Sequence, residues 1–478
     1  MRLTALLTTT AAALVVAGPA FAGDIVPVVN ASTELANDLR GLTWAHDGKL
    51  YASGHAGTVN EETRTIVARF YADGTLDPAF SEDGVVDLDL APGRQEQSLA
   101  VAELANGDVV VAVNAIDEDK GQSIYLLKFD STGKQKVAPE WGDAEGKFEV
   151  VLGWANANNE AFPDVEKPPA DTAWDLKVDT TGGTEMLVLA ALGSAPDGTG
   201  RIDADRFILK LNPADGSLDP AFNGGKAFTY HSTGTFGDNA RRILIEADGS
   251  ILAAGYTNLG EGLANHAVLT RLNPDGTPDT KFGNFIYPES SGQAVGLTPQ
   301  PGVAVFNPFV VDGGFAEVYG VAKLADGSYV TAGYGAATAE GKPSTLGYQT
   351  TVGPDLVSFH VTGGGLDMAF GEHGNGTVAV QSEGKGQPSA EERGRMAVGL
   401  PDGRAVLVGR YGGNAAIYVL TPDGHLDTAV DHDGVLVLGH PTVGAQFFNA
   451  VLSPDGKHIA LTTNADPSGA RLVVLEVQ

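Results

Sequence analysis

Two short phrases recur along the whole chain, and this repetition limits the possible folds more than any other feature. The first phrase has alternating apolar residues on both sides of an Asp-Gly or Asn-Gly pair and ends in a small residue, as in "ILIEADGSILAAG" at 243–255. The second continues with an apolar run, a turn and a Leu-Asp-x-x-Phe link, as in "KLNPADGSLDPAFN" at 210–223. A chain that repeats itself in this way builds an array of similar structural units.

Each pair of phrases predicts four β-strands. Asp-Gly between two alternating runs is a strong hairpin signal, and we expect a type I′ turn with positive φ at both central residues. The second phrase predicts a third strand, a turn and a fourth strand. In its link we expect Leu218 and Phe222 to fill the blade edge and Asp219 to cap the turn. The second repeat lacks the Leu-Asp pair, and Trp141 is expected to replace the phenylalanine there.

Seven turn glycines, one in each first phrase, count the units. They are separated by roughly 50 to 80 residues and are Gly48, Gly107, Gly183, Gly249, Gly327, Gly403 and Gly456. Four antiparallel strands in each unit, without helical periodicity, predict an all-β fold, a seven-bladed β-propeller of four-stranded antiparallel blades over residues 23–478. The last unit supplies only three strands, so we expect the mature N-terminal strand, "GDIVPVVN" at 23–30, to close the last blade.

The second phrase resembles the signature of the delta-60 repeat proteins, a bacterial β-propeller repeat family. The best match is "RLNPDG" at 271–276, followed by Asp279, Phe282 and Gly283. The resemblance extends over residues 23–478 and implies a propeller without a common enzymatic activity. The fifth repeat departs from the family pattern, because Gly363-Gly364 replaces the Asp-Gly pair.

Residues 1–22 have the pattern of a secretory signal peptide. Arg2 precedes an apolar stretch from Leu3 to Val16, and Ala20-Phe21-Ala22 has the small residues of a cleavage site. This stretch is shorter than the roughly 20 apolar residues of a membrane span. We therefore expect an exported protein, periplasmic or extracellular after cleavage, that has no membrane span and is a monomer.

The composition narrows the classes of partner and chemistry. The chain has 60 acidic and 30 basic residues, a formal net charge of −30, and no cysteine. The absence of cysteine excludes disulfides, thiolate catalysis and iron–sulfur clusters, and the negative charge disfavours nucleic acid and anionic lipid as partners. "DHDG" at 431–434 lacks the further oxygen ligands of a calcium loop. We predict no metal ligands and no cofactor, with calcium left open.

A candidate binding site follows from the propeller topology. The first strand of each blade should line the channel, and its first residues should ring the mouth on the face that carries the long segments 153–174, 288–314, 335–353 and 382–394. Counting ten and eight residues back from the turn glycines gives Asp38, Arg40, Gln97, Asn239, Arg241, Glu317, Tyr319, Arg393 and Arg395 as candidates. Trp174 falls near the same place in the third blade, whose register the count leaves open. Guanidinium groups, joined here by Arg242, favour carboxylate or phosphate, and the amides and aromatic rings suit a polyhydroxylated or carboxylated small molecule.

Three functions are compatible with this pattern. The sequence favours an exported, non-catalytic scaffold that binds a small ligand or a protein on its loop-rich face. The first alternative is a propeller hydrolase or lyase in which Asp38, Gln97, Asn239 and Glu317 hold calcium or magnesium at the channel mouth, although no general base can be named. The second is a structural surface or matrix component, in which Arg–Asp and Arg–Glu pairs lock neighbouring blades together.

Overall fold

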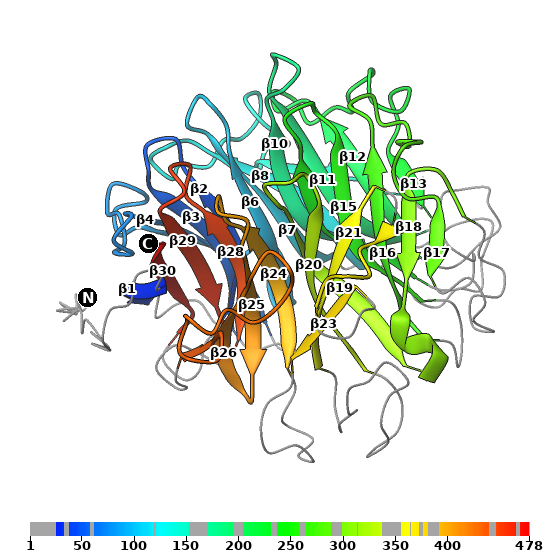
Figure 1. The fold of residues 1–478 in the computed structure, drawn as a ribbon. Helices are drawn as coiled ribbons and strands as arrows, with labels where there is room; N and C mark the ends of the chain where they lie inside the picture. Colours follow the sequence, from blue (N-terminus) through cyan, green and yellow to red (C-terminus); the bar gives the residue numbers. More distant parts are fainter. Residues whose placement is uncertain are drawn as a thin grey trace.

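Seven β-sheets form a closed ring in the computed structural model (Figure 1). The innermost strands of successive sheets contact one another around the ring, including those of the last and first sheets. The predicted all-β, seven-bladed propeller is confirmed. The structure describes residues 25–32, 38–57, 62–117, 121–152, 171–194, 204–230, 237–258, 264–287, 299–312, 314–336, 355–363, 365–371, 376–380, 392–438, 446–464 and 469–477.

The blades follow the chain, and the strands of each blade are given from the channel outward. Blade one contains β2 (Asp38–Trp44), β3 (Leu50–Gly57), β4 (Thr63–Phe70) and β5 (Val85–Leu88). Blade two contains β6 (Glu96–Glu103), β7 (Val109–Asp117), β8 (Gly121–Phe129) and β9 (Lys147–Val150). Blade three contains β10 (Thr172–Asp179), β11 (Met186–Ser194), β12 (Ala204–Leu211) and β13 (Phe228–Tyr230). Blade four contains β14 (Asp238–Ile245), β15 (Ile251–Thr257), β16 (His266–Leu272), β18 (Val303–Phe306) and β17 (Phe285–Tyr287).

The remaining blades complete the ring. A short 3₁₀ helix, η1 (Pro308–Asp312), precedes blade five, which contains β19 (Phe315–Lys323), β20 (Tyr329–Ala336), β21 (Asp355–Thr362), β22 (Gly365–Leu366) and β23 (Thr377–Val380). Blade six contains β24 (Arg393–Gly399), β25 (Ala405–Tyr411), β26 (Asn414–Leu420) and β27 (Val435–Leu438). Blade seven contains β28 (Phe447–Leu452), β29 (His458–Thr463) and β30 (Arg471–Val477), and β1 (Ile25–Ser32) pairs antiparallel with β30.

Two blades add a strand to the four-stranded plan. In blade four, β17 lies parallel to β18 at the outer edge. In blade five, β22 pairs with the end of β21. The same contact is a single bridge in other blades, for example between Phe70 and Leu76 in blade one. Blade five therefore has the same four main strands as the other blades, and β22 is an extended form of the single bridge found there. The strand β17 of blade four has no such counterpart.

The apolar cores lie between blades. Seven buried clusters are present, and each combines residues of two neighbouring blades. Leu39 and Leu42 of blade one, for example, pack in one cluster with Ala460 and Leu472 of blade seven. Because each blade buries both of its faces against its neighbours, the ring is held together mainly by the hydrophobic effect.

The hairpin turns between the two inner strands differ from the type I′ turns expected from the sequence. All seven turn glycines have φ between +73° and +90°, but the residue before each of them does not have positive φ. In blade four the amide of Gly249 donates to Glu246 O at 2.9 Å, and the amide of Glu246 donates to Ser250 O at 2.8 Å. This geometry is a type I turn followed by a left-handed glycine. The prediction of type I′ was wrong because the loop has one residue more than such a turn allows.

The Leu-Asp-x-x-Phe link of blade three fastens it to blade four, and the links of blades one and five make the same kind of bond. Asp219 Oδ1 accepts a hydrogen bond from the amide of Ala221 at 2.9 Å, and Phe222 is only 1% exposed. The amide of Asn223 then donates to Asp275 O of the next blade at 2.7 Å. The cap and the buried phenylalanine are confirmed. Leu218 is 39% exposed, so the prediction that it fills the blade edge was wrong. Its backbone pairs with Leu211 there and turns its side chain outward.

Trp141 replaces the phenylalanine of the link in blade two, as predicted. It is 2% exposed, and its indole N–H donates to Leu126 O at 3.1 Å. The predicted signal peptide at 1–22 and most of the long segments lie outside the described residues. Within the described part of the chain, no helix is long and apolar enough to cross a membrane.

We predict that His266 makes the fold sensitive to mild acid. Its ring is fully buried, Nδ1 donates to Ala264 O at 2.9 Å, and burial lowers its pKa from 6.5 to about 4. The unfolded chain therefore binds a proton at this histidine near pH 6.5, whereas the folded chain binds it only near pH 4. The free energy of unfolding consequently falls as the pH drops through this window. Between pH 7 and pH 5 the wild type should lose about 2 kcal/mol more unfolding free energy than His266→Gln. Urea denaturation at both pH values measures this, and equal losses would contradict it.

Candidate functional site

The innermost strand of every blade carries a β-bulge at the same place. The register shifts by one residue in β2, β6, β10, β14, β19, β24 and β28. The extra residue is, in blade order, Arg40, Leu99, Trp174, Arg241, Tyr319, Arg395 and Phe448. A bulge redirects a side chain out of the regular alternation of a strand. All seven of these residues line one cavity at the channel mouth.

The small residue that ends the first sequence phrase makes room for the bulge. In blades one, four, five and six this residue is glycine: Gly54, Gly255, Gly333 and Gly409. A Cβ atom on Gly255 would lie 1.9 Å from Asn239 O on the neighbouring strand, and one on Gly409 would lie 1.7 Å from Arg393 O. In these four blades the inner strand approaches its partner so closely that a side chain would not fit, whereas Val113, Ala191 and Thr463 stand at this place in the other three. The repeated glycine thus serves the bulge.

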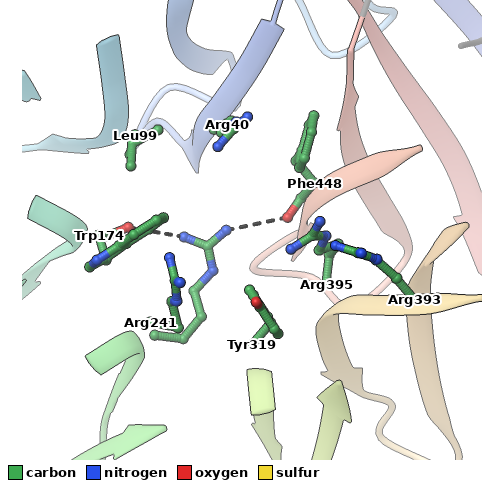
Figure 2. A pocket seen from close by; sticks show the side chains of 9 residues that line it. Arg40, Leu99, Trp174, Arg241, Tyr319, Arg393, Arg395 and Phe448 are labelled. Carbon is green, nitrogen blue, oxygen red and sulfur yellow. Dashed lines mark hydrogen bonds between the residues drawn. The ribbon is translucent and has the colours of Figure 1, made fainter. Parts of the chain in front are cut away.

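The cavity combines positive charge with aromatic faces. Its volume is about 280 Å³, and the seven bulge residues are joined in its lining by Arg242 and Arg393. Five of the nine lining residues are therefore arginines, and none is acidic. Figure 2 shows the labelled side chains converging from separate blades. This is a concentrated positive charge in a chain whose formal net charge is −30.

Arg241 is held by aromatic rings and a neutral hydroxyl. Its guanidinium carbon lies 3.5 Å from the ring centroid of Trp174 and 5.0 Å from that of Tyr319. Its Nη2 donates to the hydroxyl of Tyr256 at 2.8 Å. No carboxylate among the described residues forms an ion pair with it. Its charge is therefore oriented by the protein but left without a counter-ion from the described residues.

Two other arginines are more firmly engaged. Arg40 donates to Asp38 Oδ2 at 2.6 Å, and its guanidinium lies 4.4 Å from the ring centroid of Phe448. Arg242 donates to the backbone oxygens of Trp174 and Phe448, both at 3.3 Å, and these bonds are the dashed lines in Figure 2. Arg242 thus joins opposite sides of the ring through two carbonyl groups. Burial, with Arg40 and Arg241 nearby, lowers its pKa.

Arg395 shows the energetic consequence of crowding like charges. Burial lowers its pKa from 12.5 to about 10, and the positive charges of Arg393 and Arg40 act in the same direction. Its one hydrogen bond to a described side chain is a long one, 3.5 Å from Nη2 to Gln446 Oε1. A pKa below that of the unfolded chain means that the charged form is destabilised by folding, by up to about 3 kcal/mol at neutral pH. An anion in the cavity would reverse this effect.

The structure brings most of the sequence-predicted candidates together. Arg40, Trp174, Arg241, Tyr319, Arg393 and Arg395 line the cavity, whereas Gln97 lines an adjoining one. Asp38, Asn239 and Glu317 line neither of these two cavities. Asp38 pairs with Arg40, Asn239 O accepts from Arg206, and Glu317 accepts from Tyr319 and Asn265. These three act as supports of other residues, and the ligand-binding role of the set stays a prediction.

Sequence reasoning missed part of both cavities. Leu99 stands at the counted position of blade two but was passed over as apolar. His55 and Gln122, which line the adjoining cavity, lie on β3 and β8, which counting back from the turn glycine does not reach. Thr172 begins the inner strand β10, one residue beyond the counted position. In an antiparallel hairpin the end of the second strand lies beside the start of the first. Applying this rule to blade one would have placed His55 opposite Asp38, at the same mouth.

The oxygen-rich metal site of the enzyme alternative has no counterpart in the described part of the chain. Among these residues no group of three or more His, Cys, Asp or Glu side chains is arranged to hold a metal ion. Of the four residues expected to hold calcium or magnesium, three line neither cavity.

A serine, a histidine and an aspartate meet in blade five, away from both cavities. His360 Nε2 lies 2.5 Å from Ser328 Oγ, and its Nδ1 lies 3.0 Å from Asp367 Oδ2. Ser328 also donates to Asp326, so its proton is not directed at the histidine. In blade one, Arg69 occupies the place of His360 and pairs with the link aspartate at 2.7 Å. The histidine thus joins the third strand to the link as the arginine does, which is a structural role.

The chain matches one protein-family model. Residues 46–80 and 246–282 match a β-propeller domain of unknown function, DUF5122. Both segments run from a hairpin turn to the buried phenylalanine of the link, in blades one and four. Together with the seven blades, the matches define the chain as a β-propeller repeat protein. The narrower resemblance to the delta-60 repeat proteins stays a prediction. No curated protein matches the chain in sequence.

Several solved structures are distantly similar. The periplasmic gluconolactonase of Pseudomonas aeruginosa is 13% identical, with 85% of this chain and 86% of that chain covered and a TM-score of 0.43. The WD40 repeats of RRP9 are 10% identical, with 95% and 98% covered and a TM-score of 0.43. A luciferin-regenerating enzyme is 10% identical, with 94% and 95% covered and a TM-score of 0.38. At these values none of them bears on the function of this chain.

We predict that Gly255→Ala disturbs the bulge that holds Arg241. The new methyl group must push Asn239 O away, so the unfolding free energy should fall by about 1–3 kcal/mol and Arg241 should shift. The control is Gly182→Ala, a position with open space around the Cβ and without positive φ. Chemical denaturation measures both variants. Equal stability of the two would show that the glycine does not serve the bulge.

We predict that Arg395→Gln stabilises the ligand-free protein. The substitution removes a charge that burial and neighbouring arginines disfavour, so the unfolding free energy should rise by about 1–3 kcal/mol at pH 7. Arg404→Gln is the matched control, because Arg404 pairs with Asp402 at 2.7 Å and Asp427 at 3.3 Å, and its loss should destabilise by about 1 kcal/mol. Denaturation in low salt tests the pair. A lower unfolding free energy in Arg395→Gln would contradict the claim that the charge of Arg395 is destabilising in the folded protein.

Proposed function

We propose that this propeller is a non-catalytic binding protein that holds a small anion at its channel mouth. The observation that carries this proposal is the lining of the cavity, with five arginines and no acidic residue. Guanidinium groups bind carboxylate and phosphate with directed, charge-assisted hydrogen bonds. A volume of about 280 Å³ suits a small molecule rather than a protein segment. The secretion pattern at 1–22 would make the site available in the periplasm or outside the cell.

The contacts of the arginines favour binding over a purely structural ring. A structural lock would pair each arginine with an aspartate or glutamate of the next blade. Arg40 pairs with Asp38 of its own strand, at 2.6 Å, and Arg241 and Arg395 form no ion pair with a described residue. Instead Tyr319 packs beside both, with centroids 5.0 and 4.7 Å from their guanidinium carbons. Keeping uncompensated charge in place at a cost in stability is typical of a site that awaits a ligand.

The same contacts count against a hydrolase or lyase at this mouth. A general base needs a carboxylate, imidazole or similar group within hydrogen-bond reach of the bound molecule. The lining of the charged cavity supplies guanidinium groups, two aromatic side chains besides Tyr319, and Leu99. Burial and the charge of Glu317 raise the pKa of the Tyr319 phenol, so it stays protonated at neutral pH and cannot accept a proton as a general base. In the adjoining cavity the imidazole of His55 is bonded to Gln97, and the carboxylate of Glu96 accepts from three backbone amides. The proposal therefore assigns the mouth to binding.

We predict that inorganic phosphate and citrate bind the mature protein and that Arg241 is required. Titration calorimetry at low ionic strength should give saturable binding that weakens as sodium chloride is added. Arg241→Gln should weaken binding about ten- to hundredfold, the loss expected for a charged hydrogen-bond donor. Arg404→Gln, distant from the cavity, should bind as the wild type does. Absence of binding by every anion, or equal affinity in Arg241→Gln, would reject the proposal.

A further inference from the structure

A second cavity of about 310 Å³ adjoins the charged one. It shares Arg40, Leu99 and Trp174 with its neighbour, so the two form one continuous site. It extends over blades one to three, away from Arg241 and Arg395. Its other lining residues are His55, Thr63, Gln95, Glu96, Gln97, Asn114, Gln122 and Thr172. These are hydroxyl, amide and imidazole side chains with a single carboxylate.

The polar side chains of this second cavity are neutral hydrogen-bonding groups. Gln97 Nε2 donates to His55 Nδ1 at 3.2 Å, which places the ring proton on Nε2. Burial lowers the pKa of His55, so the ring is uncharged at pH 7. The amide nitrogen of Gln122 donates to Asp171 O and to Thr172 Oγ1, at 2.9 and 2.7 Å, while its amide oxygen accepts no bond from a described residue. Such groups, able to donate and accept, suit hydroxyl groups on a ligand.

The one carboxylate of the second cavity is already used by the protein. Glu96 accepts hydrogen bonds from the amides of Thr65, Leu90 and Ala91, at 2.6, 2.6 and 2.8 Å. It therefore offers little to a ligand, but its charge disfavours a second anionic group at this end. The continuous site has one end for a negative charge and one end for uncharged polar groups.

We infer that the ligand is a small polyhydroxylated carboxylic acid of the sugar-acid class, bound across both cavities. This inference rests on the proposed function and makes it more specific. The carboxylate lies among Arg241, Arg393 and Arg395, and the hydroxyl groups extend past Trp174 toward Gln97 and His55. Inorganic phosphate or a short acid fills only the charged end. An uncharged polyol fills only the neutral end and leaves the arginines without a counter-ion.

Three six-carbon probes separate the contributions of charge and hydroxyl groups. Gluconate carries a carboxylate and five hydroxyl groups, hexanoate keeps the carboxylate alone, and sorbitol keeps the hydroxyl chain alone. By calorimetry on the mature protein, gluconate should bind at least about tenfold more tightly than hexanoate, the gain of one or two neutral hydrogen bonds. Sorbitol should bind about a hundredfold more weakly than gluconate, the loss of charge-assisted bonds.

Two variants locate these contributions within the site. Gln97→Leu should reduce gluconate affinity about tenfold and change hexanoate affinity less than about twofold, because only the neutral end is altered. Arg395→Gln should weaken both acids. Equal affinity of gluconate and hexanoate, or an equal effect of Gln97→Leu on both, would overturn the sugar-acid inference and leave anion binding intact. Failure of both acids and of phosphate would instead overturn the proposed function.

Discussion

The β-bulge in the first strand of each blade is the constraint on which the site depends. In a regular strand successive side chains point alternately toward the two neighbouring blades. None of them points into the channel. One extra residue per blade interrupts this alternation at the same height in all seven strands. The seven freed side chains meet at one mouth of the ring. In blades one, four, five and six, the glycine that ends the hairpin phrase allows the adjacent strand to approach the bulge closely.

The charge gathered by these bulges is opposite to that of the molecule. The chain has a formal net charge of −30, yet the mouth presents Arg241 and Arg395 without acidic partners in the described part of the chain. Burial, together with the charges of Arg393 and Arg40, lowers the pKa of Arg395 and costs stability in the free protein. The aromatic rings of Trp174, Tyr319 and Phe448 compensate in part, because ring faces attract cations. The anion that we propose as ligand would recover the remaining cost on binding.

Much of this architecture can be predicted from the sequence, because its rules are local. The alternation, the turn glycines and the link that buries Phe222 define a blade, and their repetition defines the ring. Counting from the turn glycine also identifies Arg40, Arg241, Tyr319 and Arg395, since in these blades the bulge lies eight residues before it, whereas Trp174 lies nine before. The bulge itself was not predicted, although Gly255 and its counterparts signal it. The partners of Asp38 and Glu317 depend on side-chain packing in three dimensions, which spacing does not reveal. The second cavity combines strand ends from three blades, and no single phrase contains it.

The account is tested most directly by locating an anion in a crystal of the mature protein. Crystals soaked in sodium selenate would show the selenium position by its anomalous scattering. We predict a peak at the channel mouth, within hydrogen-bonding distance of the guanidinium groups of Arg241 and Arg395. Ordered selenate found only at other surfaces, with these guanidinium groups bound to carboxylates of the chain itself, would contradict the central claim that the bulges assemble an anion site.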